Sequence, residues 1–191
     1  MSDRSNPVLA RTPPQILGPF YPIARTPELG GDLTRHGGGK ASGTVLYLSG
    51  RVTTVAGDPV PDAQIEIWQA NANGRYDHPG DENPAPLDPH FAGYGLLRTD
   101  ADGRYAAKTI RPIAYPVAPG VIRPAHIHFM VTSRTERLVT QMYFSGDAYN
   151  AIDPFLASAR RKDALIVTPF PAGRADDPGA EMAEFNIVIG A

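Results

Sequence analysis

The chain has 191 residues, no cysteine and a formal net charge of −2. Its length suits one domain with a full apolar core. Its small net charge gives no reason to expect nucleic acid or a membrane surface as a partner. The lack of cysteine excludes disulfides, thiolate metal sites and a cysteine nucleophile. A metal ion must then be held by His, Tyr, Asp or Glu, which favours a hard, oxidised ion.

The first 43 residues predict an arm and a crossing segment rather than part of a core. Residues 1–12 are polar and lack an apolar stretch of signal-peptide type. No run in the chain is long enough to span a membrane, so we expect a cytoplasmic protein. Residues 15–22 (QILGPFYP) hold two aromatics between prolines, which is typical of a stiff segment that lies across a surface. The glycines of residues 25–43 indicate a loop.

Short strands separated by Gly, Pro and Asp turns are predicted over residues 44–191. In the segment AQIEIWQ (63–69), Ile65 and Ile67 share one face and Trp68 lies on the other. Asp153, as N-cap of a following proline, predicts the one helix, over 154–163. Strands are expected over residues 44–48, 50–55, 63–69, 96–99, 104–110, 125–132, 137–144 and 182–189. We therefore expect a single, mainly β domain, an antiparallel β-sandwich with long loops and one short helix.

The run RPAHIHF, residues 123–129, carries the strongest chemical signal. If it is a strand, His126 and His128 point to one face and Ile127 to the other. Arg123 then precedes the strand and can reach over its end. Two imidazoles on one face make half of a metal site. The alternative is a pair of hydrogen-bonded histidines on a half-buried strand.

Six stretches of the sequence, taken together, resemble the intradiol ring-cleavage dioxygenases. A GRY or HIH motif alone is weak evidence for the family. Two separated tyrosines together with RPAHIH and TQMYF, all in the same order along one chain, are specific evidence for it. The six stretches follow one another along most of the chain. They are LGPFYP (17–22), SGRV…GDPVPDAQIEIWQANANGRYDH (49–78), LDPHFAGYG (87–95), RTDADGRY…TIRP…YP (98–116), IRPAHIHF (122–129) and TQMYFSGD (140–147).

The resemblance implies a β-sandwich that holds Fe(III) between its sheets and their loops. It implies no further cofactor. Two tyrosinates and two histidines would bind the iron, and residue by residue these positions are Tyr76, Tyr115, His126 and His128. Phenolates are hard, anionic donors, which fits a ferric ion and a chain without thiolates. Zinc would more often select Cys or a third His.

The resemblance also implies roles in catalysis for three residues. Tyr115 would leave the iron when a diol binds and would accept a proton. Arg123 would stabilise negative charge at the attacked carbon as a fixed cation. Gln141 would donate a hydrogen bond near the same centre. Each has a plain alternative, since Tyr115 could be loop packing, Arg123 could pair with a carboxylate and Gln141 could be a satisfied strand residue.

The implied reaction is cleavage of a catecholic substrate by O2 to a cis,cis-muconate-type diacid. The resemblance is greatest to the family's protocatechuate-cleaving members, so we expect protocatechuate to give 3-carboxy-cis,cis-muconate. Hydroxyquinol or a substituted catechol is the alternative. Val117 stands where many of those members have tryptophan. The chain combines an N-terminus like their non-catalytic chain with ligands like their catalytic chain, so we expect a homo-oligomer.

Two further questions stay open at the level of sequence. The stretch SGRV to GRY (49–76) alone also resembles transthyretin-like sandwiches, so a non-catalytic binding module is a second hypothesis. The local sequence of Tyr76, NGRY, recurs loosely as DGRY at Tyr105, which we interpret as a structural copy. A substrate carboxylate needs a cation, for which the candidates are Arg25, Arg75, Arg111 and Arg134.

Overall fold

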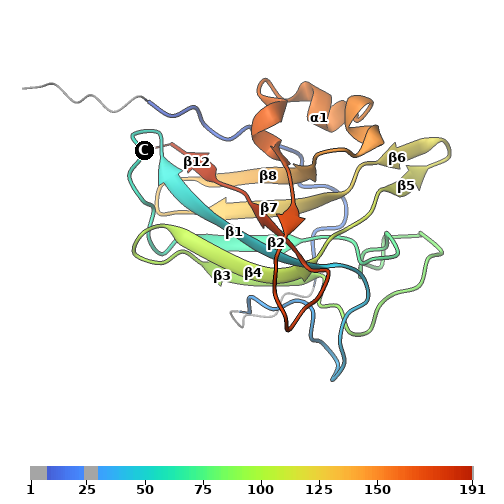
Figure 1. Cartoon of the computed structure of the whole chain (residues 1–191). Helices are drawn as coiled ribbons and strands as arrows, with labels where there is room; N and C mark the ends of the chain where they lie inside the picture. Colours follow the sequence, from blue (N-terminus) through green and yellow to red (C-terminus); the bar gives the residue numbers. More distant parts are fainter. Residues whose placement is uncertain (1–7, 24–29, 191) are drawn as a thin grey trace, which may run out of the picture.

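Two β-sheets face each other across an apolar interior (Figure 1). The computed structural model describes residues 8–23 and 30–190. It confirms a mainly β sandwich with long loops and one short helix. Residues 1–7 of the predicted arm and 24–29 of the predicted crossing segment, which include Arg25, lie outside the described residues. The division of the chain at residue 44 stays a prediction.

The first sheet is built on the long strand β1 (Val45–Thr54). One edge of β1 pairs antiparallel with β4 (Arg104–Ile110). The other edge pairs parallel with β11 (Glu181–Glu184) and β12 (Ile187–Ile189), and β10 (Phe170–Pro171) pairs with β11. The sheets are therefore mixed, although the sequence predicted antiparallel pairing. The parallel pairs arise because the end of the chain crosses from the second sheet back to β1.

The second sheet runs in the order β3 (Tyr94–Arg98), β2 (Gln64–Trp68), β7 (His126–Thr132), β8 (Arg137–Phe144) and β9 (Ile166–Val167). Its pairs are antiparallel except for β8 with β9. The histidine-bearing strand β7 is therefore central and has a neighbour on both edges. A central strand holds its side chains at fixed positions, which suits a site built on it.

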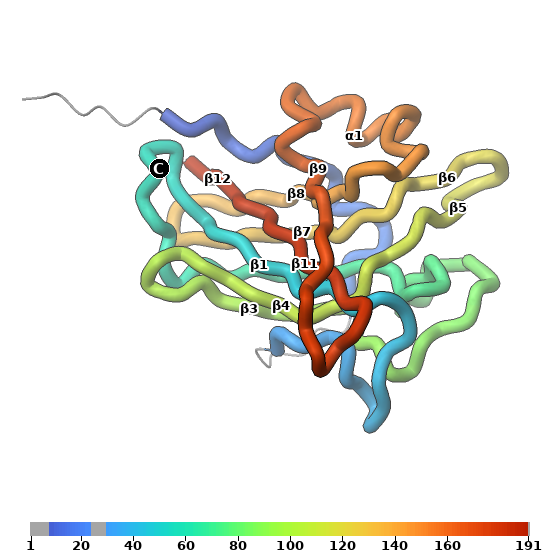
Figure 2. The backbone as a smooth tube through the Cα atoms, in the orientation of Figure 1, coloured from blue at the N-terminus to red at the C-terminus, as the bar shows by residue number. Residues whose placement is uncertain are grey.

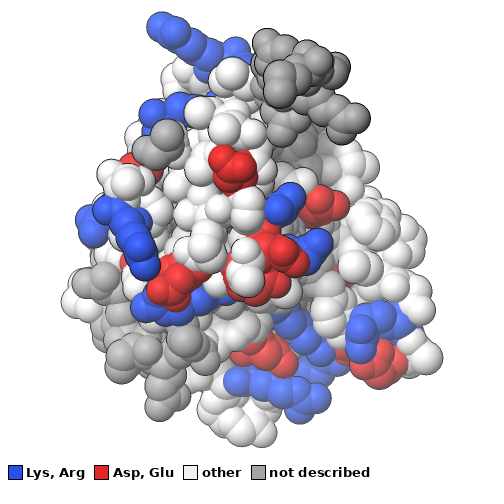
Figure 3. Space-filling model, turned by 90° about the vertical axis from the view of Figure 1, so that its left-hand side faces the viewer, with Lys and Arg blue, Asp and Glu red and all other residues white. Residues whose placement is uncertain are grey.

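The remaining elements lie at the ends and edges of the sheets. β5 (Tyr115–Ala118) and β6 (Val121–Arg123) pair only with each other, and their hairpin projects from the sandwich (Figure 2). Two 3₁₀ turns, η1 (Ala148–Ala151) and η2 (Lys162–Leu165), flank the helix α1 (Pro154–Ser158). Among the residues described, no helix has the length and apolar character needed to cross a bilayer. On the face shown in Figure 3, basic and acidic side chains are interspersed.

The predicted helix over 154–163 is shorter in the structure. Asp153 and Pro154 begin it as expected, because the Asp153 carboxylate accepts the Leu156 N–H at 2.7 Å. The backbone is already extended at Ala159, with φ −73° and ψ 127°. Leu156 is the one buried residue of α1, so a single helical turn is enough to bury the inward-facing side chain of this segment.

The predicted strand over 182–189 is interrupted between β11 and β12. Both β11 and β12 pair with β1 in one continuous register. Leu46 of β1 is opposite Glu181 of β11, and Val52 of β1 is opposite Ile187 of β12. Between them the Phe185 carbonyl accepts the Tyr105 hydroxyl at 2.5 Å. A Cβ at Gly50 would lie 2.1 Å from that carbonyl oxygen, so the close approach requires glycine here.

Strand alternation separates the core from the other face of the second sheet. Ile127, Phe129 and Val131 of β7 belong to the main core, together with Ile65 and Ile67 of β2. The intervening residues of these strands point to the opposite face, as the sequence predicted. Both histidines therefore lie on the outer face of this sheet, beneath loops. The site expected between the sheets and their loops would therefore lie between this sheet and the loops that cover it.

We expect Phe129→Ala to lower the free energy of unfolding by about 3–5 kcal/mol. The ring is fully buried and lies 5.0 Å from Phe185 and 6.2 Å from Tyr105, both of the first sheet, so its loss leaves a cavity between the sheets. Urea unfolding measures the effect. Phe170→Ala removes a half-exposed ring of the first sheet and should cost less than about 0.5 kcal/mol. Equal losses would contradict this location of the core.

Candidate metal centre

The loop after β2 places the Tyr76 side chain. The Asn71 carboxamide oxygen accepts the N–H groups of Asn73 at 2.9 Å and Arg75 at 3.1 Å, which closes a tight turn. The Tyr76 N–H donates to Asp81 at 2.7 Å. Gly74, at φ +78°, passes so close to the β5 strand that a Cβ would lie 2.8 Å from Cβ of Tyr115. The turn thus brings Tyr76 against Tyr115.

The β5–β6 hairpin carries Tyr115 and Arg123 directly opposite each other. Sequence analysis missed this hairpin, because Pro116 and Pro119 obscure a strand pattern. Tyr115 is buried, while Val117 and Val121 beyond it are each 46% exposed. The β5–β6 hairpin therefore positions the Tyr115 phenol and the Arg123 guanidinium side by side.

The two histidines face this phenol pair from β7. His126 Nδ1 lies 2.7 Å from the Pro124 carbonyl oxygen, so Nδ1 carries the proton and Nε2 has a free lone pair. The His128 ring stacks on Trp68 at 4.7 Å and 9°. His128 Nδ1 has no hydrogen-bond partner among the described residues, so stacking and packing orient this ring. Gly18 crosses above it, where a Cβ would lie 3.1 Å from His128 Cε1.

Four donor atoms converge on one point in this arrangement. His126 Nε2 lies 3.2 Å from His128 Nε2, 3.4 Å from the Tyr76 hydroxyl and 3.5 Å from the Tyr115 hydroxyl. The two hydroxyls are 3.4 Å apart. Donors bound to one transition metal at about 2.0–2.1 Å have separations of this size. The four side chains proposed as ligands from sequence are therefore adjacent; their binding of a metal stays a prediction.

Burial keeps all four groups neutral when no cation is present. It raises the pKa of Tyr115 to about 12 and the pKa of Tyr76 well above its ordinary value. Burial also lowers the pKa of His126 to about 3 and that of His128 well below the usual range, with the Arg123 charge acting in the same direction. Without a metal ion, a neutral His128 that carries its proton on Nε2 can donate it to His126 Nε2 at 3.2 Å. A bound metal ion would take the place of this hydrogen bond and favour the phenolates.

The donor set itself fits a ferric ion. It offers two phenol oxygens and two imidazole nitrogens, with neither sulfur nor carboxylate. No group of three or more His, Cys, Asp or Glu side chains in residues 8–23 and 30–190 could hold a metal. The phenols are therefore essential to any site at this place.

Arg123 lies beside the four donors as a buried cation with three hydrogen-bond partners. Its Nε donates to Asp153 at 2.6 Å, and one terminal nitrogen donates to Gln141 at 2.8 Å and Tyr143 at 3.1 Å. The guanidinium also packs on Phe155 at 4.5 Å. The structure thus brings Arg123 and Gln141 together, as the sequence predicted. It assigns the carboxylate partner to Asp153, which the sequence analysis considered only as a helix cap.

The N-terminal segment covers this cluster from outside the sheet. Gln141 donates to the Ile16 carbonyl at 2.9 Å, and the Tyr143 hydroxyl lies 3.0 Å from the Gln15 carboxamide oxygen. The Phe20 ring lies 5.0 Å from Tyr76. The stiff segment predicted to lie across a surface therefore closes the candidate metal centre. Sequence analysis assigned no role to Gln15 or Tyr143, although Tyr143 lies within the motif TQMYF (140–144).

A hollow of about 530 Å³ lies next to the loop and the hairpin that carry the two phenols. Phe20, the loop 80–84 and the hairpin residues 116–120 line it, so Val117 is part of its wall. Phe20 also lies 5.0 Å from the Tyr76 ring, which connects the hollow to the four donors. The charged lining residues of the hollow are Asp81 and Glu82, and no lysine or arginine is among them.

The three described candidate cations for a substrate carboxylate do not line the hollow. Arg111 pairs with Glu181 at 2.9 Å, and Arg75 donates to the Ala85 carbonyl at 2.8 Å. Arg134 is in the turn between β7 and β8, beyond the end of β7 that is opposite the histidines.

Comparison with known proteins agrees with this fold. A family model described as "Dioxygenase" matches residues 16–191. The protocatechuate 3,4-dioxygenase beta chain of Burkholderia cepacia is 40% identical over 178 residues, which are 90% of this chain and 76% of that one. Hydroxyquinol 1,2-dioxygenase of Corynebacterium glutamicum is 33% identical, over 91% of this chain and 62% of its own. The crystal structure of 3-chlorocatechol 1,2-dioxygenase from Rhodococcus opacus 1CP superposes with a TM-score of 0.76 at 27% identity, covering 94% of this chain and 72% of that one.

The sandwich fold and the matched family model define a dioxygenase. Together with the relatives, they show that the chain belongs to the intradiol ring-cleavage dioxygenase family. Its activity is therefore intradiol cleavage of an aromatic diol. The match spans nearly the whole chain, whereas the transthyretin-like resemblance covered only residues 49–76, so the hypothesis of a non-catalytic module is not retained.

We expect Asp153→Asn to destabilise the protein by about 3–5 kcal/mol, because it leaves the buried Arg123 charge without a carboxylate. Asparagine is as good an N-cap as aspartate, so the helix cap is retained and the loss reports on the charge. Urea unfolding measures it. Asp147→Asn, at the cap of η1, is the matched control and should cost about 1 kcal/mol or less. A small loss for both variants would refute the importance of this ion pair.

Proposed function

We propose that the protein is a non-haem Fe(III) enzyme that uses O2 to cleave a catechol between its hydroxyls, giving a cis,cis-muconate-type diacid. Tyr76, Tyr115, His126 and His128 would hold the iron. The observation that carries this proposal is the convergence of their four donor atoms within 3.5 Å of His126 Nε2. Family membership supports the choice of iron.

Ferric iron, when bound, draws electron density from a chelated catecholate and so makes its ring carbons reactive toward O2. The residues of the chain supply binding, proton transfer and charge. As a phenolate, Tyr115 would be a strong base toward a diol hydroxyl, because burial raises the pKa of its phenol to about 12. Its hairpin pairs with no other strand, so Tyr115 can move more readily than the histidines of the central strand.

Arg123 and Gln141 would act on charge that develops on the substrate. Asp153, Gln141 and Tyr143 hold the guanidinium in place, so it needs no reorganisation during the reaction. Phe20 and the N-terminal segment exclude water from the same volume. A fixed cation in a dry site stabilises negative charge more than the same cation in water.

For the substrate we propose protocatechuate, which gives 3-carboxy-cis,cis-muconate. The 40% identity to a protocatechuate 3,4-dioxygenase beta chain supports it. The second candidate is a diol without a carboxylate, such as hydroxyquinol or catechol. The acidic lining of the hollow, with Asp81 and Glu82 and without a basic side chain, favours this candidate. A homo-oligomeric state stays a prediction that light scattering can test.

We expect Tyr76→Phe to remove one phenolate-to-iron charge-transfer band and most of the activity of the iron-loaded protein. Tyr115→Phe should affect iron binding less, if Tyr115 is the ligand that would give way to the diol, as we propose. Visible spectra with and without anaerobic protocatechuate measure both effects. Tyr105→Phe is the matched control, because this tyrosine follows the same GR dipeptide but its hydroxyl bonds Phe185 in the core. A Tyr76→Phe spectrum equal to that of the parent would count against the site.

We expect kcat/KM to be largest for protocatechuate in a panel that includes hydroxyquinol and catechol. A tenfold or greater preference for a diol without a carboxylate would select the second candidate. Glu82→Gln should raise kcat/KM for protocatechuate more than for catechol, because it removes a negative charge from the hollow. Glu184→Gln, on β11, serves as a control and should change neither value.

A further inference from the structure

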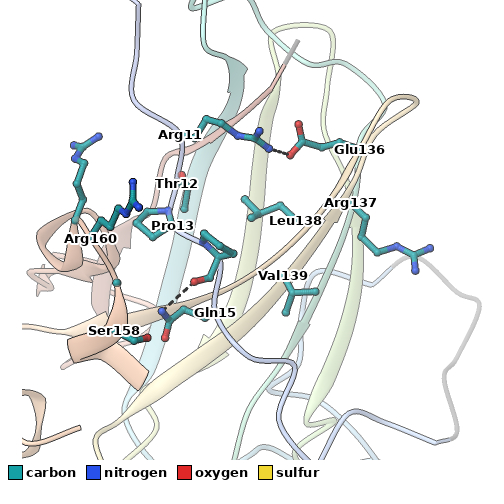
Figure 4. Close-up of a pocket in the computed structure, with 13 residues that line it drawn as sticks. Arg11, Thr12, Pro13, Gln15, Glu136, Arg137, Leu138, Val139, Ser158 and Arg160 are labelled. Carbon is teal, nitrogen blue, oxygen red and sulfur yellow. Dashed lines mark hydrogen bonds and ion pairs between the residues drawn. The ribbon is translucent and has the colours of Figure 1, made fainter. Parts of the chain in front are cut away.

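A second cavity shares no lining residue with the hollow. It has a volume of about 720 Å³ and is bounded by the N-terminal segment, the start of β8 and the chain that follows α1 (Figure 4). Pro13, Leu138, Val139 and Ala159 form apolar parts of its lining. Its size is that of a small-molecule site, for which about 300–1,000 Å³ is typical. We call it the arginine groove.

The arginine groove is strongly basic in a chain whose net charge is −2. Four arginines and one glutamate line it, namely Arg11, Arg137, Arg160, Arg161 and Glu136. Arg11 and Glu136 pair with each other. The other three arginines make no ion pair within the described part of the chain. In Figure 4, Arg137 is directed away from the groove and Arg160 lies beside Pro13.

The lining selects the chemistry of a ligand. Guanidinium groups bind carboxylates through paired hydrogen bonds. Apolar side chains between the arginines favour a hydrocarbon skeleton over a bare inorganic anion. An organic molecule with two carboxylates satisfies both conditions, since it neutralises Arg160 and Arg161 and covers the apolar floor.

Two walls of the arginine groove are connected to Arg123. The first is the N-terminal segment, where Gln15 accepts a hydrogen bond from Tyr143, which in turn accepts one from Arg123. The second is the chain after α1, whose N-cap Asp153 binds Arg123 directly. A ligand that contacts both walls would therefore affect two groups that hold the Arg123 guanidinium, namely Tyr143 and Asp153.

We propose that the arginine groove is a second binding site, for an organic dicarboxylate, and that its occupancy changes turnover through Arg123. The proposal rests on the proposed function in one respect, since the diacid product of that reaction is the natural candidate ligand. Occupancy alters the position of Arg123 and so changes kcat more than KM. The chemical class of the ligand follows from the groove alone.

The test uses iron-loaded protein held anaerobically with saturating catechol, so that the candidate metal centre is blocked and no turnover occurs. Calorimetric titration with cis,cis-muconate should then show one binding event. Arg160→Ala combined with Arg161→Ala should weaken it on the order of tenfold or more. Arg35→Ala, an exposed arginine outside the groove, is the matched control and should leave it unchanged. In aerobic assays, added muconate should alter kcat for the parent but not for the double variant.

Two outcomes would overturn the proposal. One is the absence of muconate binding to the diol-blocked parent, or equal binding by the double variant. The other is a change in molar mass of the double variant by light scattering without muconate binding, which would make the groove an interface between copies of the chain. A protein that binds neither iron nor diol would fail the proposed function instead, and the muconate titration would still report on the groove.

Discussion

A single buried ion pair joins the parts of this protein that make its active region. Arg123 is carried there by the β5–β6 hairpin, and Asp153, the N-cap of α1, neutralises it at 2.6 Å. A charge removed from water is tolerated only when it is paired and hydrogen-bonded. The helix, the hairpin, strand β8 and the N-terminal segment must therefore all be in place for Arg123 to be buried. This constraint explains why elements with few apolar contacts of their own are held over the outer face of the second sheet.

The two faces of strand β7 differ in role, since one packs in the core and the other carries the two histidines. Its odd-numbered side chains from Ile127 to Val131 pack in the core between the sheets, and His126 and His128 occupy the opposite face. Because β7 is central, both histidines are fixed by pairing on two sides. The two tyrosines come from a loop and a hairpin, which can vary without disturbing the core. The imidazoles thus come from a central strand and the phenols from elements outside the two large sheets.

Much of this arrangement follows from local patterns in the sequence. Period-two alternation predicted β2, β7 and β8, and an Asp-Pro pair predicted the start of α1. The side chains proposed as ligands came from a family resemblance, and the structure places their donor atoms together. Local patterns could not show that Asp153 would serve Arg123, since the two are 30 residues apart. They also missed the proline-containing β5–β6 hairpin and the parallel pairing of β1, which depends on where a distant strand returns.

The stacking of Trp68 on His128 has a practical consequence. Trp68 is the only tryptophan in the chain, so the whole indole emission of the protein arises 4.7 Å from a proposed iron ligand. Its ring is almost fully buried and its Nε1 has no hydrogen-bond partner within the described residues. A ferric phenolate absorbs light and is paramagnetic, so it quenches a neighbouring excited indole. If iron binds at the proposed ligands, the tryptophan emission of the unlabelled protein would therefore report metal occupancy.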